Sequence, residues 1–249
     1  VEDQEGRVWI CTEGGGLNLF DRKSERFTHF ASNPRVNPIA HNNLKDIAYS
    51  AKRNKLYIGT QTGGLSIFNL STQRFRNLYY EVPKYGSIAG DRIFQMQIWK
   101  DKYLIFTTAN GVVKMDLDTE QVSYLFPHHK FTSITWLAID TADYIWLALG
   151  KMVYRVNLHD EHQQELFHCG ERGLGTEDIS VLYTDSKGNV WLGTRGSGLY
   201  VYDKLTNSFK GYTTANSMIP SDYCYAICES RQGLLIVSSD KGVAFFDQE

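Results

Sequence analysis

Two histidine clusters are the residues of this sequence whose types and spacing first suggest chemistry. They are His128-His129 and the run His159-Asp160-Glu161-His162. A zinc site needs three or four ligands, so an HxxH pair in a turn would need another ligand from elsewhere in the chain. The sequence contains no GxSxG, HExxH or CxxC motif. We therefore interpret both clusters as solvated turns, and we predict no catalytic residue, no metal and no cofactor for this segment.

Glycine-bearing turns are the second feature with potential chemistry, because glycine-rich loops can hold phosphate groups. They recur as Gly14-Gly15-Gly16, Gly63-Gly64, Asn110-Gly111, Gly196-Ser197-Gly198 and Lys241-Gly242. A phosphate-binding loop needs a helix N-terminus after it. Strand-forming residues follow each of these turns instead, so they are interpreted as hairpin turns.

The four cysteines do not predict a disulfide framework. Cys224 and Cys228 lie four apart in an expected strand, which separates them by about 13 Å, too far to bridge. Cys11 occupies a position that Gly59 and Gly193 fill in similar segments, which indicates a small packing residue.

A short segment of strand-forming residues recurs six times along the chain. These segments form the framework that must position any functional side chains. Their anchors are separated by 42 to 48 residues and are Trp9, Tyr57, Leu104, Trp146, Trp191 and Leu235. A repeat of about 40–50 residues made of short strands is typical of a β-propeller blade. The predicted fold is therefore all-β, a propeller of four-stranded antiparallel blades.

The fifth repeat shows the expected strands most clearly. Strand A covers residues 179–185, strand B 190–194, strand C 199–203 and strand D 209–212, each joined by a short turn. Strands are also expected at 8–12 and 56–60. The aromatic residue of strand B is interpreted as filling the gap between adjacent sheets, with a sugar-binding platform as the alternative.

About six repeats are present, and the array is incomplete at both ends. The first repeat has only the last part of strand A, and the sixth has no strand D, which predicts an arc of a longer propeller. The repeats cover approximately residues 1–30, 44–79, 93–126, 133–167, 179–212 and 224–247.

The bulk composition narrows the function classes. The 249 residues are 42% hydrophobic and carry a net charge of −2. This balance provides no field that would attract nucleic acid or an anionic membrane. No apolar run reaches the length of a membrane-spanning helix. We predict no nucleic acid and no membrane contact for this segment.

The repeats resemble the two-component regulator propeller repeat. The pattern is carried by Asp185, Gly188-Asn189, Trp191 to Thr194, Gly198-Leu199 and Tyr202-Asp203, and again by Glu2-Asp3, Gly6-Arg7, Trp9, Thr12, Gly16-Leu17 and Phe20-Asp21. The resemblance is looser in the third and fourth repeats. Such repeats form the periplasmic sensor region of hybrid two-component systems, especially in Bacteroides.

The resemblance implies a periplasmic, non-catalytic segment that recognises glycan breakdown products and regulates the genes for their use. It implies that the chain is an arc of a seven-bladed propeller with an oligosaccharide ligand, and that the parent protein has further blades, a β-sandwich, an inner-membrane anchor and a histidine kinase outside this chain. A homodimer is a further option. The alternatives are a propeller lyase or glycosidase, whose carboxylates could come from separate blades, and a protein–protein interaction scaffold.

Long D–A loops give the candidate ligand-binding residues. These loops cover residues 31–43, 80–92, 168–178 and 213–222, and they should share one face with the B–C turns. Variable loops on a rigid scaffold commonly carry specificity. The candidates on that face are His41, Asn42, Tyr85, Arg92, Arg172, Asp178, Arg195 and Tyr223.

Overall fold

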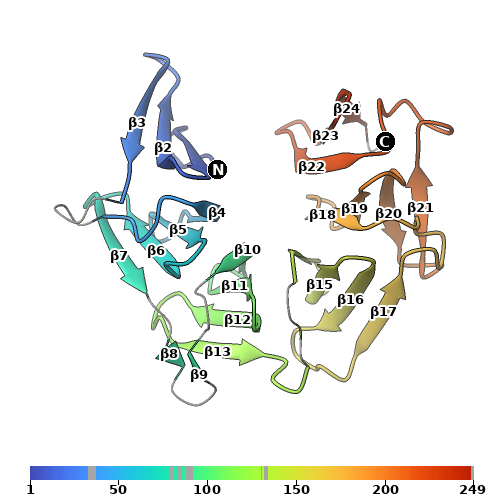
Figure 1. Cartoon of the computed structure of the whole chain (residues 1–249), viewed down its shortest axis with the longest axis horizontal. Coiled ribbons are helices and arrows are strands. Elements are labelled where there is room, and N and C mark those ends of the chain that lie inside the picture. The colour runs from blue at the N-terminus through green and yellow to red at the C-terminus, as the bar shows by residue number, and fades with distance from the viewer. Residues whose placement is uncertain are drawn as a thin grey trace. The chain divides into compact units, whose positions relative to one another are not determined.

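The computed structural model describes residues 1–32, 38–78, 81–82, 86–87, 92–129, 131 and 134–247. The chain forms two compact units, Val1–Ile134 and Thr135–Glu249, and each is built from antiparallel sheets whose strands meander in sequence order (Figure 1). Within the described residues, no helix is long and apolar enough to cross a membrane.

The first unit contains three larger sheets and a short hairpin. Sheet 1 consists of β1 (Val8–Thr12), β2 (Gly16–Asp21) and β3 (Arg26–Phe30). Sheet 2 consists of β4 (Leu44–Ser50), β5 (Lys55–Thr60), β6 (Leu65–Asn69) and β7 (Arg74–Leu78). The hairpin pairs β8 (Glu81–Val82) with β9 (Gly86–Ser87). Sheet 3 consists of β10 (Ile93–Trp99), β11 (Tyr103–Thr108), β12 (Gly111–Asp116) and β13 (Val122–Leu125).

The second unit contains three sheets. Sheet 4 consists of β14 (Trp136–Ile139), β15 (Tyr144–Leu149), β16 (Met152–Asn157) and β17 (Gln164–His168). Sheet 5 consists of β18 (Ile179–Thr184), β19 (Val190–Thr194), β20 (Leu199–Asp203) and β21 (Ser208–Tyr212). Sheet 6 consists of β22 (Cys224–Glu229), β23 (Leu235–Ser239) and β24 (Gly242–Phe246). The prediction of antiparallel propeller blades is confirmed.

The two three-stranded sheets differ from the others in the way the repeat pattern predicts. Sheet 1 has no full strand A, and an isolated bridge between Glu2 and Val8 stands in its place. Sheet 6 ends at β24 and has no strand D among the described residues.

The hydrophobic core is divided into layers, each lying between two neighbouring sheets. In the first unit, one cluster joins Trp9 to Phe68 across sheets 1 and 2, and another joins Tyr57 to Phe106 across sheets 2 and 3. In the second unit, Trp146 packs with Tyr202 between sheets 4 and 5. This layering follows from the two-residue period of a strand, which sends alternate side chains to opposite faces of each sheet.

The strand-B tryptophans fill the gaps between sheets, as interpreted from the sequence. Trp146 is fully buried, and its ring centroid lies 4.7 Å from that of Tyr202 in the next sheet. Trp191 packs against Phe246 of sheet 6 in the same way, with ring centroids 6.4 Å apart. Because these rings are buried on both sides, the alternative of a sugar-binding platform is excluded for them.

A threonine or serine at the end of strand B closes the glycine turns as hairpins. The Oγ1 hydroxyl of Thr194 donates to the carbonyl of Gly198 at 2.8 Å, and that of Thr60 donates to Gly64 at 2.9 Å. The same two carbonyls also accept from the backbone N–H groups of Thr194 and Thr60 at 3.1 Å, so each hydroxyl adds a second hydrogen bond that closes the turn. No phosphate-loop geometry is formed, because β20 and β6 follow these two turns directly.

Candidate ligand-binding face

In the second unit, the chain brings three of the predicted site residues together at the B–C turn of sheet 5. The backbone N–H of Arg195 donates to the carbonyl of Asp178 at 2.9 Å. Arg195 also forms an isolated antiparallel bridge with Tyr223, which precedes strand A of sheet 6. Asp178, Arg195 and Tyr223 therefore converge from three separate segments, and the backbone fixes their spacing.

Tyr223 is the exposed aromatic residue of this group. The residue is 47% exposed, and its ring lies against Gly196, where an added Cβ would stand 3.3 Å from the ring atom Cζ. The glycine thus leaves room for the ring at the turn. Arg195 is exposed and Asp178 is half-buried. An aromatic face flanked by a guanidinium and a carboxylate can hold a sugar ring and pair with its hydroxyls.

Asp222, which was not among the predicted site residues, fixes this arrangement. Its carbonyl accepts hydrogen bonds from the N–H groups of Gly196 (3.1 Å) and Gly198 (2.9 Å). Its carboxylate accepts from the backbone N–H of Thr214 at 2.7 Å. One residue therefore ties the B–C turn of sheet 5 to the loop that precedes sheet 6.

Asn42 accepts the equivalent hydrogen bonds in the first unit. Its carbonyl accepts from the N–H groups of Gly14 and Gly16, and its Oδ1 accepts from the N–H of Ser32 at 2.6 Å. His41 is also engaged locally, because its Nδ1 accepts from the N–H of Asn43 at 2.9 Å. These two predicted site residues lie on the expected face, and both stabilise the loop that carries them.

The side chain of Arg172 contacts strand D of sheet 4 and not the turn that carries Arg195. Its guanidinium lies 3.4 Å from Oε2 of Glu165 and over the ring of Phe167, 5.1 Å from the centroid, while its carbonyl accepts from the N–H of Phe209 at 2.8 Å. Arg172 thus joins strand D of sheet 4 to strand D of sheet 5. Sequence position in a D–A loop did not reveal this, because the loop after β17 places Arg172 back beside the D strands.

The remaining two predicted residues belong to the loop before sheet 3. Arg92 lies over the ring of Phe94, 4.7 Å from its centroid, which anchors the guanidinium at the start of β10. Tyr85 lies outside the described residues.

The sequence analysis missed a polar network that surrounds Arg155 between sheets 4 and 5. The guanidinium lies 3.7 Å from the centroid of Tyr144 and pairs with Oε1 of Glu165 at 2.8 Å. Asn207 donates to the other carboxylate oxygen at 2.8 Å. Burial alone would raise the pKa of Glu165, but the hydrogen bonds from Asn207 and Arg155 outweigh it and hold this pKa below its usual value. The pairing of Arg155 with Glu165 across two strands could be recognised only once their register was known.

Histidine and cysteine chemistry adds no second site in the described residues. His159 pairs with Asp143 through Nε2 at 3.0 Å, and no group of three or more metal-ligating side chains occurs in the part of the chain that the structure describes. All four cysteines are free. Burial, assisted by Asp46, raises the pKa of the Cys11 thiol to about 12, so this thiol stays protonated at neutral pH.

The comparisons with known proteins agree with the class of repeat that the residues resemble. Residues 173–196, which run through β18 and β19, match the model of the two-component regulator propeller family. The resemblance is therefore confirmed for the fifth repeat. No curated protein gives a significant match.

Solved structures match the fold along the whole chain. The extracellular domain of the putative hybrid two-component system BT3049 from B. thetaiotaomicron is 21% identical with a TM-score of 0.80, and the match covers 100% of this chain and 33% of that one. The extracellular domain of the putative one-component system BT4673 from the same organism is 15% identical with a TM-score of 0.73, and the match covers 98% and 32%.

Virginiamycin B lyase from Staphylococcus aureus also has this fold. It is 13% identical with a TM-score of 0.71, and the match covers 98% of this chain and 77% of the lyase. The chain therefore spans about a third of the length of the two Bacteroides domains and has the propeller fold that sensors and lyases share. It is a propeller segment that resembles the extracellular domains of two-component sensors.

Proposed function

We propose that this chain is a ligand-sensing segment of a periplasmic two-component sensor, and that it recognises oligosaccharides released by glycan breakdown. The observation that carries the proposal is the family match at residues 173–196, because the same residues build the turn that displays Arg195. The ligand would regulate genes for glycan use through signalling modules of the parent protein. Those modules, further blades and a β-sandwich are partners that the proposal expects in the parent.

The face around Arg195 is suited to such a ligand. Tyr223 offers an exposed ring, and Tyr225, two residues later, is 52% exposed. Arg195 and Asp178 provide a cation and an anion beside them, held by backbone bonds on rigid strands. Sugars bind through stacking and through re-paired hydroxyl groups, so their affinity depends on several such contacts acting together. We infer that this face prefers acidic or neutral oligosaccharides.

Isothermal titration calorimetry with a panel of neutral and acidic oligosaccharides tests the proposal. We expect saturable binding of at least one oligosaccharide and none of nucleotides or lipids. The same panel distinguishes the lyase and glycosidase alternative, because an enzyme would shorten the oligosaccharides on prolonged incubation. Product formation that disappears when a single carboxylate is replaced would overturn the sensor proposal. Binding of a protein partner with no oligosaccharide binding would favour the scaffold alternative.

A further inference from the structure

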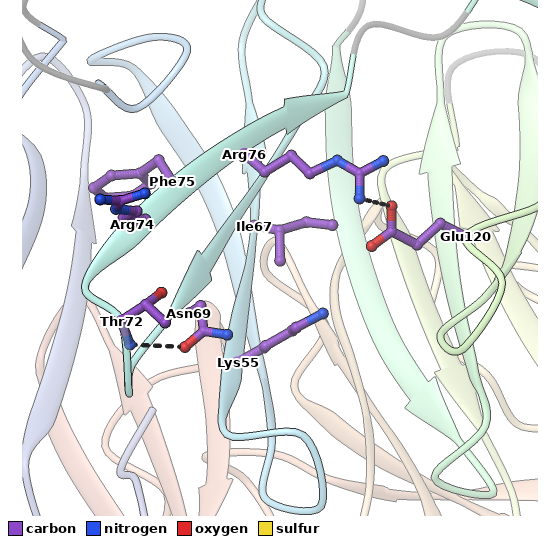
Figure 2. A pocket seen from close by; sticks show the side chains of 8 residues that line it. All are labelled: Lys55, Ile67, Asn69, Thr72, Arg74, Phe75, Arg76 and Glu120. Carbon is purple, nitrogen blue, oxygen red and sulfur yellow. Dashed lines mark hydrogen bonds and ion pairs between the residues drawn. The ribbon is translucent and has the colours of Figure 1, made fainter.

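A cavity of about 210 Å³ lies between sheets 2 and 3, at the end of the sheets where the C–D turns are. Its lining consists of Lys55, Ile67, Asn69, Thr72, Arg74, Phe75, Arg76 and Glu120. Figure 2 shows the side chains of Lys55 and Arg76 extending in the same direction, with Ile67 between them and Glu120 facing Arg76. Four of the eight lining residues are charged, which is unusual for a gap between packed sheets.

Beside the cavity, a short side chain occupies the position that a long one has in sheet 4. Ile67 pairs with Tyr57 on one side and with Arg76 on the other. Arg155 has the same place in sheet 4, between Trp146 and Glu165. The guanidinium of Arg155 fills the gap between sheets 4 and 5 and packs on aromatic rings. Isoleucine cannot reach as far, so the corresponding gap between sheets 2 and 3 stays open.

The charges around the cavity are not balanced within the part of the chain that the structure describes. Nη1 of Arg76 lies 2.7 Å from Oε2 of Glu120, which makes one ion pair. Neither Lys55 nor Arg74 has an ion pair or a side-chain hydrogen bond with any described residue. Oε2 of Glu120, the oxygen in this ion pair, is buried. The cavity therefore combines two cations that have no ion-pair partner among the described residues with a carboxylate that Arg76 holds through one oxygen.

The second unit indicates what kind of group suits this place in the blade. There, the carboxylate of Glu165 is held by Arg155, Arg172 and Asn207 at 2.8, 3.4 and 2.8 Å. A carboxylate on strand D thus pairs with the cations in the gap between sheets 4 and 5. In sheet 2 the strand-D residue at that position is Arg76, so sheets 2 and 3 contribute cations but no carboxylate for Lys55 and Arg74.

We propose that this cavity binds a small hydroxylated carboxylate, about the size of one uronic acid. The carboxylate pairs with Lys55 and Arg74, and a hydroxyl donates to Glu120. Charge-assisted hydrogen bonds of this kind are short and strong, and the ligand hydroxyl would donate to the carboxylate oxygen of Glu120 that Arg76 does not hold. The proposal does not rest on the proposed function, because the cavity and the face around Arg195 are built from different residues.

An NMR titration of the full chain with glucuronate tests this proposal. We expect saturable shifts of the backbone amides of Asn69, Thr72 and Arg76. Replacing Lys55 with methionine keeps most of the apolar length of the side chain and removes its charge, and it should weaken binding at least about tenfold. Lys52→Met is the matched control, since Lys52 is exposed in the preceding turn and does not line the cavity. The control should bind glucuronate like the parent chain.

Titrations with glucose and with sulfate test the hydroxyl contact and the charge contact separately. Glucose has the hydroxyls without the carboxylate, and sulfate has the charge without the hydroxyls, so both should bind at least about tenfold more weakly than glucuronate. Glu120→Gln should reduce the preference for glucuronate over sulfate. Equal binding of sulfate and glucuronate, or no saturable shift at these amides, would overturn the proposal. If Lys55→Met does not fold, Arg74→Met gives the same test, because Arg74 is exposed on strand D.

Discussion

The indole N–H of Trp191 donates a hydrogen bond to Oδ2 of Asp185 at 2.7 Å, and both residues are buried. The same bond joins Trp9 to Asp3 at 2.7 Å and Trp146 to Asp140 at 3.1 Å. In each case the aspartate precedes the tryptophan by six residues, and its other oxygen accepts from N–H groups of the A–B turn. A recurrent buried carboxylate therefore joins the turn to the ring that fills the gap between sheets.

Asp185→Ala should lower the free energy of unfolding by about 3 kcal/mol. The change leaves the buried indole N–H of Trp191 and the N–H of Asn189 without their acceptor. Urea denaturation measures the effect, with the exposed Lys204→Ala as the control that should change little. Equal and small losses in both variants would contradict a structural role for the Asp185–Trp191 bond.

Arg155→Met should be destabilising by about 2 kcal/mol, because it removes the main partner of Glu165 and the stacking on Tyr144. The matched control is Arg22→Met, which removes an ion pair with Glu2 whose arginine is 57% exposed. Exposed ion pairs contribute little, so the control should lose less than about 1 kcal/mol. Thermal unfolding of both variants makes the comparison, and a larger loss in the control would count against the Arg155 network.

Gly198→Ala should be more destabilising than Gly233→Ala, although both glycines have a positive φ, of 103° and 82° respectively. An added Cβ at position 198 would overlap the carbonyl oxygen of Tyr212, whereas at position 233 the nearest atom is 3.9 Å away. We expect losses of about 3 and 1 kcal/mol, since only the first combines backbone strain with a steric clash. Similar losses in chemical denaturation would show that the conformation alone, and not the contact with Tyr212, requires glycine.

The stability of the chain should decrease between about pH 4 and pH 6 through Asp46. Burial raises the pKa of this carboxyl from 3.8 to about 6, despite hydrogen bonds from the N–H groups of Met96 and Ile47. The folded state therefore binds the proton more tightly than the unfolded chain does. The resulting stabilisation is full below about pH 4 and is lost as the pH rises through about 6.

Asp46→Asn should remove this dependence, because asparagine stays neutral across the range. The free energy of unfolding at pH 4 and pH 7 should thus differ less in Asp46→Asn than in the parent chain. The exposed Asp240→Asn should keep the parent's pH dependence. If Asp46→Asn and the parent lose the same stability between the two pH values, Asp46 is not the group responsible.

The blades could be predicted from the sequence because their signal is local. The strand expected at 190–194 is β19, and the one expected at 56–60 is β5, which starts one residue earlier at Lys55. In the segment around Trp191, successive side chains alternate with the two-residue period of a strand, and a glycine-bearing turn follows the segment. Even the three-stranded form of sheets 1 and 6 followed from comparing repeats.

The site was only partly predictable, because it depends on which way loops and side chains turn. Loop position correctly grouped Arg195 with Tyr223, since both lie at strand ends that a meander brings together. It also grouped Arg172 with them, whereas that guanidinium pairs with Glu165 instead. The cavity beside Ile67 had no sequence signal, because its lining residues come together only through the register of strands B, C and D.

Calorimetric titration of paired variants at the face around Arg195 tests the central claim most directly. The ligand would be the best-binding acidic oligosaccharide of the panel, and the variants would be Arg195→Met, Tyr223→Ala and the control Lys204→Ala. The account predicts that each of the first two weakens binding at least about tenfold, through loss of a charge-assisted bond or of ring stacking, and that the control has no effect. Unchanged affinity in both Arg195→Met and Tyr223→Ala would contradict it.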